Sequence, residues 1–202
     1  MPRFTGEKLL IATHNAGKLA EMADLLAPFG VTCVSAAALG LAEPEETERT
    51  FVGNARIKAH AGAKASGLPA LADDSGMSVD ALGGAPGVYT ANWAETPHGR
   101  DFDMAMRRVW AELETVSRVP PQSAQFRCTL VLAWPDGSDV VCEGVMPGQI
   151  VWPARGNQGH GFDPIFQPDG YTQTFAEMDR WEKNRISHRG RAFQQLIAEC
   201  FE

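Results

Sequence analysis

Apolar and polar positions alternate along the first third of the chain with two different periods. Short apolar runs bounded by turn residues are typical of strands, whereas apolar residues three and four apart are typical of one face of a helix. Thr50 is an N-cap residue, and Gly30 and Gly67 are helix-ending residues. The pattern predicts a strand over residues 8–13, a helix over 18–29, a strand over 31–35, an acidic loop over 36–49 and a helix over 51–66.

The remainder of the chain combines helical periodicity with a strand hairpin. Residues 100–116 form the clearest helix, with Phe102, Met106, Val109, Trp110 and Leu113 on one face. Residues 123–134 alternate apolar and polar side chains, and Asp136-Gly137 turns this strand into a hairpin with residues 140–145. A glycine-rich loop over residues 157–166 and a helix over 187–200 follow.

Strands that alternate with helices, followed by a hairpin, predict an α/β (mixed α+β) fold. We expect a twisted central mixed sheet flanked by helices, with two lobes around a substrate cleft. Residues 1–202 are then a single domain of two lobes, and the polar stretch 116–122 is the candidate division between them. No internal repeat or low-complexity segment is present.

Composition and charge restrict the classes of binding partner and the compartment that we expect for this chain. The net charge is −7 and no long basic run occurs, which argues against nucleic acid as the main partner but is compatible with a small polyanion bound by a few lysines. The early apolar run over residues 9–12 is too short for a signal peptide or a membrane span. The four cysteines lack metal-type spacing, so we expect a cytoplasmic protein without a membrane partner.

The stretch LADDSGMSVDALGGAPG (residues 71–87) places two carboxylates, Asp73 and Asp74, behind an apolar strand and before Ser75 and Gly76. Reactive groups are commonly held where a strand meets a loop, so the pair is a candidate catalytic site. Asp, Ser and Gly are also ordinary turn residues, and that structural interpretation stays open.

Residues 13–18 read Thr13, His14, Asn15, Ala16, Gly17 and Lys18, between a strand and a helix. Backbone N–H groups at a helix N-terminus beside an ammonium suit a phosphate chain. The loop is not a P-loop, which requires Ser or Thr after the lysine, where this chain has Leu19. An ordinary turn remains an equal alternative.

Two further segments carry charges suited to a metal and phosphates. The acidic loop over residues 43–48 offers carboxylates to Mg²⁺ if the fold brings Glu45 or Glu46 to the aspartate pair. Lys58 shares a helix face with Asn54, four residues before it. By default the acidic residues and the lysine are simply solvated.

A glycine-rich loop and a basic segment offer groups for a ring system. Gly159 to Pro164 joins backbone freedom to an aromatic pair, His160 and Phe162, and a carboxylate, which is suited either to a base or to a structural loop. Lys183, His188 and Arg189 form what we predict to be a basic helix start, which is equally a surface feature.

Six blocks follow one another in a specific order: THNAGK, the EET loop, FVGNARIKA, ADDSGMSVDALGGAPGVY, GHGFDPIF and KNRISHRG. Together they resemble the inosine triphosphate pyrophosphatase family from Leu9 to Phe193. The resemblance implies hydrolysis of non-standard purine nucleoside triphosphates (ITP, dITP, XTP) to the monophosphate and pyrophosphate. It also implies Mg²⁺ as cofactor and a homodimer, for which Trp93 and Trp152 are candidate exposed contacts.

The resemblance also implies a role for each matching residue. Asp74 is the proton acceptor and Asp73 supports it, Lys58 neutralises phosphate charge, and Glu45 with Asp74 faces the metal. The nucleotide-binding residues it implies are Thr13, His14, Asn15, Ala16, Gly17, Lys18, Ser75, His160, Gly161, Phe162, Asp163, Lys183, His188 and Arg189. Two positions depart from the family pattern: His160 replaces a phenylalanine, and Gly53 replaces a frequent glutamate.

Two other functions stay open at this point. A nucleotide pyrophosphatase of the septum-inhibition type would act on other nucleotides, although the SHRG block favours purines. A nucleotide-sensing module would bind triphosphates without hydrolysing them, and its expected sign would be the loss of Asp74 or of the acidic loop.

Overall fold

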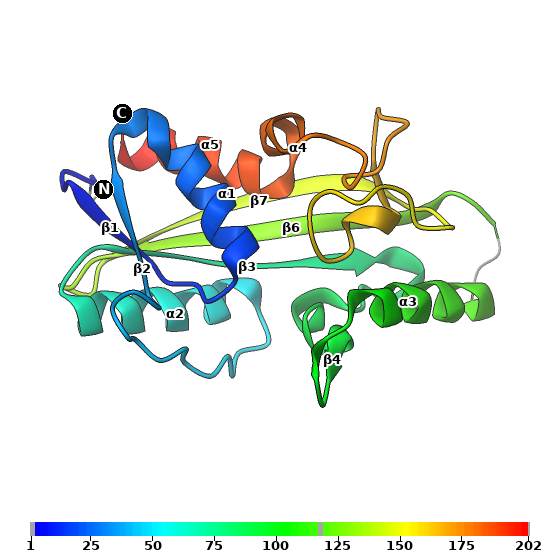
Figure 1. Cartoon of the computed structure of the whole chain (residues 1–202), viewed down its shortest axis with the longest axis horizontal. Coiled ribbons are helices and arrows are strands. Elements are labelled where there is room, and N and C mark those ends of the chain that lie inside the picture. The colour runs from blue at the N-terminus through cyan, green and yellow to red at the C-terminus, as the bar shows by residue number, and fades with distance from the viewer. Residues whose placement is uncertain (1–2, 117–118, 202) are drawn as a thin grey trace. The chain divides into compact units, whose positions relative to one another are not determined.

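The computed structural model describes residues 3–116 and 119–201 (Figure 1). Within these residues the α-helices are α1 (Ala16–Leu26), α2 (Phe51–Ser66), α3 (Phe102–Val116), α4 (Arg180–Ile186) and α5 (His188–Cys200). The strands are β1 (Lys8–Ile11), β2 (Thr32–Ser35), β3 (Ala70–Val79), β4 (Glu95–Thr96), β5 (Gly99–Arg100), β6 (Gln122–Ala133), β7 (Asp139–Ile150) and β8 (Phe166–Pro168).

Six of these strands form one mixed sheet in the order β2-β1-β3-β6-β7-β8. β1 runs parallel to β2 and to β3, and Ile11, its last residue, lies opposite Leu71. β7 runs antiparallel to β8, with Ile150 opposite Phe166. β4 and β5 form a separate two-stranded sheet. The mixed α/β fold predicted from the sequence is therefore confirmed.

The chain divides into two compact units. Unit 1 comprises residues 1–74, 128–144 and 189–202, and unit 2 comprises residues 75–127 and 145–188. The predicted division at residues 116–122 is wrong, because both of its flanks belong to unit 2; residues 117 and 118 lie outside the described residues. The chain passes between the units inside β3, β6 and β7, and again at the start of α5, between His188 and Arg189.

In unit 1 helices cover the strands on both faces: α1 and α5 on one, α2 on the other (Figure 1). Leu130 and Leu132 of β6 pack with apolar side chains of α1 and α5, while Val131 and Ala133 pack with the alanines of α2. A strand buried on both faces loses its alternation. The period-two pattern predicted over residues 123–134 therefore holds only for the first half of β6, where burial alternates.

In unit 2 an aromatic core packs beneath α3. Met106 and Val109 of α3 are buried with Phe126, Phe166 and Phe175. The Phe126 ring lies 4.7 Å from Phe166 and 5.8 Å from Phe175, measured between ring centroids. This core supports the loops that follow β7.

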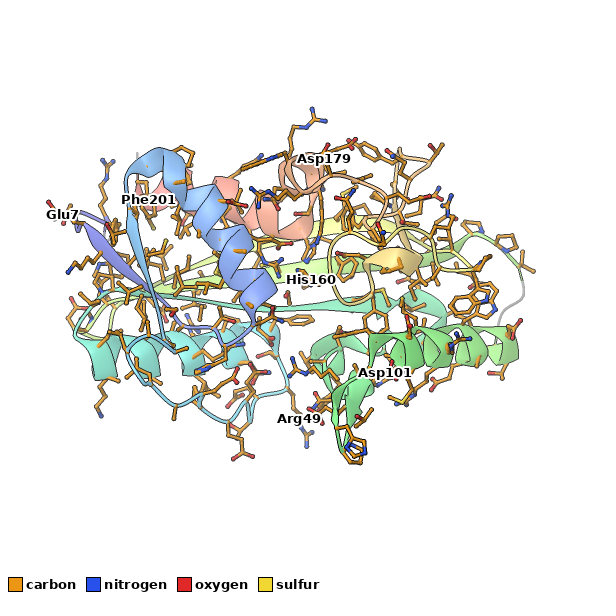
Figure 2. The ribbon with its side chains drawn as sticks, in the orientation of Figure 1. Glu7, Arg49, Asp101, His160, Asp179 and Phe201 are labelled. Atoms are coloured by element: carbon orange, nitrogen blue, oxygen red, sulfur yellow. The ribbon has the colours of Figure 1, made fainter. Side chains whose placement is uncertain are left out.

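Helix ends follow the capping residues of the sequence. The Thr50 side chain accepts from the Gly53 N–H to cap α2, and Gly67 ends it with a φ of 68°. α4 was not predicted: Asp179 (Figure 2) caps it by accepting from the N–H groups of Trp181 and Glu182. α5 then begins after Ser187, whose extended backbone separates the two helices. The short strands β4, β5 and β8 were also missed, since they carry too few residues for a readable period.

Candidate active site

Asp73 and Asp74 lie in the middle of β3, not at its end. The expectation of a strand end is therefore wrong: Asp, Ser and Gly are turn residues by preference, but here they continue the strand to Val79. The neighbouring strand is the one that ends. The Ala12 N–H donates to Leu71, after which the chain leaves β1 for α1, so the two aspartates lie just past the carboxyl end of a parallel neighbour.

The loop after β1 has the capping geometry of a helix N-terminus. Thr13 Oγ1 accepts from the Asn15 N–H, and Asn15 Oδ1 accepts from the Lys18 N–H, each at 3.1 Å. α1 then begins at Ala16, which places Lys18 in its first turn as expected from the sequence. His14 is exposed in the same loop. The positive end of the helix and the side chain of Lys18 therefore belong to the same helix start.

Asp73 is almost completely buried on the side of β3 that faces α1 and α5. Its Oδ2 lies 3.1 Å from Lys18 Nζ and 3.2 Å from Arg189 Nη2. Burial alone would raise the pKa of this carboxyl, but the charges of Lys18, Arg189 and Lys58 outweigh it and hold the pKa well below its usual range. Asp73 is therefore ionised at neutral pH.

Asp74 points to the opposite side of the strand, toward α2, because successive side chains in a strand alternate. Its Oδ1 lies 3.9 Å from Lys58 Nζ, and its Oδ2 accepts a hydrogen bond of 3.3 Å from Asn54 Nδ2. Burial raises the pKa of Asp74 to about 6, with help from the charges of Glu46 and Asp73, although Lys58 opposes the shift. Asp74 can therefore exchange a proton near neutral pH.

The acidic loop reaches this side through Glu46, whose carboxylate forms an ion pair with Lys58. Glu45, the acid favoured from the resemblance, is exposed, as Glu46 is. Asn54 also holds the loop, because its Oδ1 accepts from the Glu48 N–H at 2.9 Å. Sequence reasoning did not assign Asn54 to the site; its position one turn before Lys58 on the same helix face was the available signal.

The departure at Gly53 has a steric reason. A Cβ at this position would come within 2.6 Å of Glu48 Cβ and 2.7 Å of Glu48 Cγ. The stem of Glu48 therefore occupies the space that a side chain at position 53 would need. Beside this loop, a cavity of about 250 Å³ is bordered by His14, Glu43 and Lys58 and otherwise lined by Ala12, which follows β1, and by small and apolar residues of α2 and of the loop itself.

Two carboxylates, Asp74 and Glu46, are the oxygen donors that this side offers to a cation. In the part of the chain that the structure describes, no three His, Cys, Asp or Glu side chains converge on one point. Magnesium usually takes only one or two carboxylates and completes its shell with water and phosphate oxygens. The donor set fits that ion, because the carboxylates of Asp74 and Glu46 both lie beside the same Lys58 ammonium.

In unit 2 the predicted nucleobase residues form a second cluster. Lys183 Nζ lies 2.8 Å from Asp163 Oδ2, and both side chains are buried. The same oxygen accepts from the His160 N–H at 2.8 Å, so Asp163 fixes the glycine-rich loop to α4 (His160 is labelled in Figure 2). The His188 ring stacks on Phe126 with centroids 4.7 Å apart.

Other predicted residues of this cluster lie differently. Phe162 is buried in the core of unit 2 with its edge toward Phe102, so in this structure the ring packs inside the protein. Ser75 is the first residue of unit 2 along β3, and Gly161 adopts a φ of 66° that favours glycine. Arg189 belongs to unit 1, where it contacts Asp73.

Comparisons with known proteins show the family of this chain. The sequence profile of the Ham1 family matches residues 9–199, which include every site residue described above. This chain belongs to the Ham1 family. The resemblance drawn from the six sequence blocks is therefore confirmed.

Among Ham1-family relatives, the chain is 68% identical to the dITP/XTP pyrophosphatase of Ruegeria pomeroyi, over 98% of this chain and 97% of the relative. It is 55% identical to the dITP/XTP pyrophosphatase of Rhodospirillum centenum, again over 98% and 97%. The solved structure of a HAM1 protein from Coxiella burnetii superposes with a TM-score of 0.86 at 38% identity, covering 96% of this chain and 98% of that one.

Proposed function

We propose that this protein hydrolyses the non-standard purine nucleoside triphosphates ITP, dITP and XTP to the nucleoside monophosphate and pyrophosphate. Two relatives that share more than half of its residues are named dITP/XTP pyrophosphatase. The observation that carries the proposal is Asp74, a buried carboxyl with a pKa of about 6 that lies between a helix lysine and an acidic loop. A nucleotide-sensing module would have no use for a proton acceptor tuned in this way.

In the reaction Asp74 accepts the proton of a water molecule that attacks the α-phosphorus in line with the leaving pyrophosphate. Base catalysis of this kind contributes about 10²–10⁴-fold. Lys18 and Lys58 balance the charge that moves onto the leaving group, and the N–H groups at the start of α1 bind phosphate oxygens. Asn54 orients Asp74 through its amide.

Asp74 and Glu46 would hold the cofactor, for which we propose Mg²⁺. When bound, the ion supplies charge neutralisation at the phosphate oxygens. Glu46 also forms an ion pair with Lys58, so it would connect the proposed Mg²⁺ site to the lysine that we expect to face the phosphates. Glu45 remains a second candidate donor on the same loop.

Selection of the base belongs to the cluster in unit 2. Hypoxanthine and xanthine present an oxygen acceptor at position 6, whereas adenine presents an amino donor there. Donors of Lys183 and His188 would pair with the former and stay unpaired with the latter, at a cost of about 1–3 kcal/mol. Asp163 keeps Lys183 in place for this contact.

We also propose a cytoplasmic homodimer. All four cysteines are free thiols, which suits a reducing compartment. None of the helices in residues 3–116 and 119–201 is long and apolar enough to cross a membrane. The tryptophans expected at the dimer contact are only partly exposed: Trp152 stacks on Trp110 with centroids 5.8 Å apart, and the Arg108 guanidinium covers Trp93 at 3.7 Å.

The test is pyrophosphate release from ITP, XTP, GTP and ATP side by side, with Mg²⁺ and with EDTA. We expect ITP and XTP to be hydrolysed at least about tenfold faster than ATP, and no release in EDTA. Equal rates on ATP, or a preference for modified pyrimidines, would assign the protein to the septum-inhibition type. Binding of these nucleotides without release of pyrophosphate would support the nucleotide-sensing module instead.

A further inference from the structure

The segment over residues 172–178, which leads from β8 into α4, is bound to the glycine-rich loop over residues 155–163. Both belong to unit 2. Thr174 is fully buried, and its hydroxyl donates to the Arg155 carbonyl at the start of the loop, at 2.8 Å. We propose that Thr174 is a positioning residue for purine selection, which acts by holding this loop in place. The inference rests on the proposed function for the identity of the substrate.

The backbones of the segment and the loop are in direct contact. The Gln158 N–H donates to the Ala176 carbonyl at 3.0 Å. Gly156 has a φ of 87°, and a Cβ at this position would lie 2.3 Å from the carbonyl carbon and oxygen of Ala176. Only glycine fits so close an approach at this backbone conformation. A displacement of the segment would therefore displace the loop with it.

Glu177 prepares Thr174 for its contact with the loop. The Thr174 N–H donates to Glu177 Oε2 at 2.8 Å, and the Glu177 N–H donates to the Thr174 carbonyl at 3.1 Å. Glu177 therefore holds both backbone groups of Thr174, and the Thr174 hydroxyl donates to Arg155. Glu177 Oε2 also lies 3.7 Å from Arg155 Nη1, so charge adds to the attachment of the loop.

The same segment supports the donors that we propose for the base. The ring of Phe175, which follows Thr174, is fully buried. Lys183 Nζ lies 5.8 Å from its centroid, and the His188 ring centroid lies 6.3 Å from it. Lys183 in turn forms an ion pair with Asp163 of the loop at 2.8 Å. The proton acceptor and the two phosphate-facing lysines belong to unit 1, so a change in this segment should alter base recognition and leave phosphate recognition intact.

The two products of the proposed reaction separate these forms of recognition. IMP carries the base, whereas pyrophosphate carries only phosphates. Calorimetric titration with each, in Mg²⁺, should be made on the wild type, Thr174→Val and Thr174→Ser. The first variant removes the hydroxyl and keeps the shape of the side chain, and the second keeps the hydroxyl. ITP and ATP turnover, with kcat and KM separated, and thermal unfolding should be measured on the same proteins.

A second pair of variants tests the acid that holds Thr174. Glu177→Gln removes the charge beside Arg155, and Glu112→Gln is its matched control in the same unit. Glu112 forms an exposed ion pair with Arg108 along α3. The two substitutions are chemically identical, so a difference between them reports the position of Glu177.

We expect Thr174→Val to weaken IMP binding and to raise the KM for ITP by about tenfold, because the Arg155 carbonyl loses its donor. Pyrophosphate binding and the kcat for ITP should not change, and the ratio of kcat/KM between ITP and ATP should fall. Thr174→Ser should behave as the wild type. Glu177→Gln should weaken IMP binding less than Thr174→Val does, and Glu112→Gln should leave it unchanged. A purely structural role would instead lower thermal stability and kcat without changing the KM.

Unchanged IMP affinity in Thr174→Val, an equal loss of pyrophosphate affinity, or the same loss in Thr174→Ser would overturn the inference, as would a wild type that fails to bind IMP. Should Thr174→Val fail to fold, the comparison of Glu177→Gln with Glu112→Gln decides, and equal IMP affinities in these two variants would refute positioning. A wild type that binds IMP and pyrophosphate but hydrolyses no nucleotide would refute the proposed function alone, because the product affinities still test Thr174.

Discussion

Asp73 and Asp74 are chemically identical neighbours whose surroundings give them opposite properties. Asp73 faces α1 and α5, where Lys18 and Arg189 keep it ionised, and Asp74 faces α2, where burial and the acidic loop raise its pKa to about 6. One step along a strand reverses the side of the sheet, so adjacent residues can enter separate electrostatic environments. Two acids with separated pKa values are the usual basis for dividing roles in an active site.

The two faces of β3 therefore differ in role: the face with Asp73 has a structural role, and the face with Asp74 has a chemical one. Asp73 has its charge satisfied by two cations and has little freedom to move a proton. Asp74 has one lysine at 3.9 Å and an amide donor, and this weaker compensation leaves it able to accept a proton. The candidate pair expected from the sequence therefore lies on a strand that turns one acid to each of its two faces.

The largest effect is expected from Asp74→Asn, which removes the proton acceptor and keeps the shape. We expect kcat for ITP to fall by about 10²–10⁴-fold. Steady-state kinetics on ITP measure this, with circular dichroism to confirm the fold. A variant that retains more than a tenth of the wild-type kcat would remove Asp74 from the catalytic role.

The same variant should not lose stability. A carboxyl whose native pKa lies above its unfolded value stabilises the protein at low pH and loses that contribution as pH rises through about 6. Without Mg²⁺ at pH 8, Asp74→Asn should therefore be more stable than the wild type, by up to about 3 kcal/mol for two pKa units. The gain should vanish near pH 4, and a loss of stability at pH 8 would contradict the raised pKa.

Asp73→Asn should behave in the opposite way. It leaves the buried Arg189 and Lys18 without their shared carboxylate, which costs roughly 3–5 kcal/mol of unfolding free energy. Because the Asp73 pKa is lowered, its contribution is present above about pH 4 and is lost as pH falls further. Urea unfolding at pH 7 and at pH 3.5 should show the deficit shrinking in acid, and a constant deficit would refute the charge-based cause.

Features set by local sequence were predictable. Thr50, Gly67 and the Asp136-Gly137 hairpin act through neighbours two to four residues away, and each appears where the sequence places it. Turn preference misled the interpretation of β3, because a strand tolerates Asp and Gly when its ladder and packing continue on both sides. If the predicted strand had been extended through Ser75, the alternation of side chains along it would have placed Asp73 and Asp74 on opposite faces of the sheet.

Contacts between distant segments were not predictable from pattern alone. Arg189 and Glu21 are 168 positions apart, and nothing in either local sequence identifies the partner. Asn54 joins Glu48 and Asp74 with the two ends of one amide, a role that depends on the packing of α2. The sequence therefore located the segments of the site, while the pairing of residues between segments needed the fold.

Lys58→Met removes the cation beside Asp74 and should therefore widen the difference in pKa between Asp74 and Asp73. Lys58 lowers the Asp74 pKa, so its loss should raise that pKa further above 6 and move the acid limb of the kcat/KM profile to higher pH. Loss of a phosphate-facing cation should also reduce kcat/KM by roughly 100-fold at pH 8. An acid limb that does not move would show that Lys58 acts only on the phosphates.

The smallest effect distinguishes the two glutamates of the acidic loop. Both glutamates are exposed, but Glu46 is held at Lys58 beside Asp74, so Glu46→Gln should raise the Mg²⁺ concentration for half-maximal activity by about tenfold. Glu45→Gln, the matched control one residue away, should change it less than about twofold. A larger effect of Glu45→Gln than of Glu46→Gln would identify Glu45 as the metal ligand and would mean that the loop rearranges when substrate binds. In either case Asp73→Asn, corrected for folded fraction, should leave the Mg²⁺ requirement unchanged, because Asp73 lies on the other face of β3.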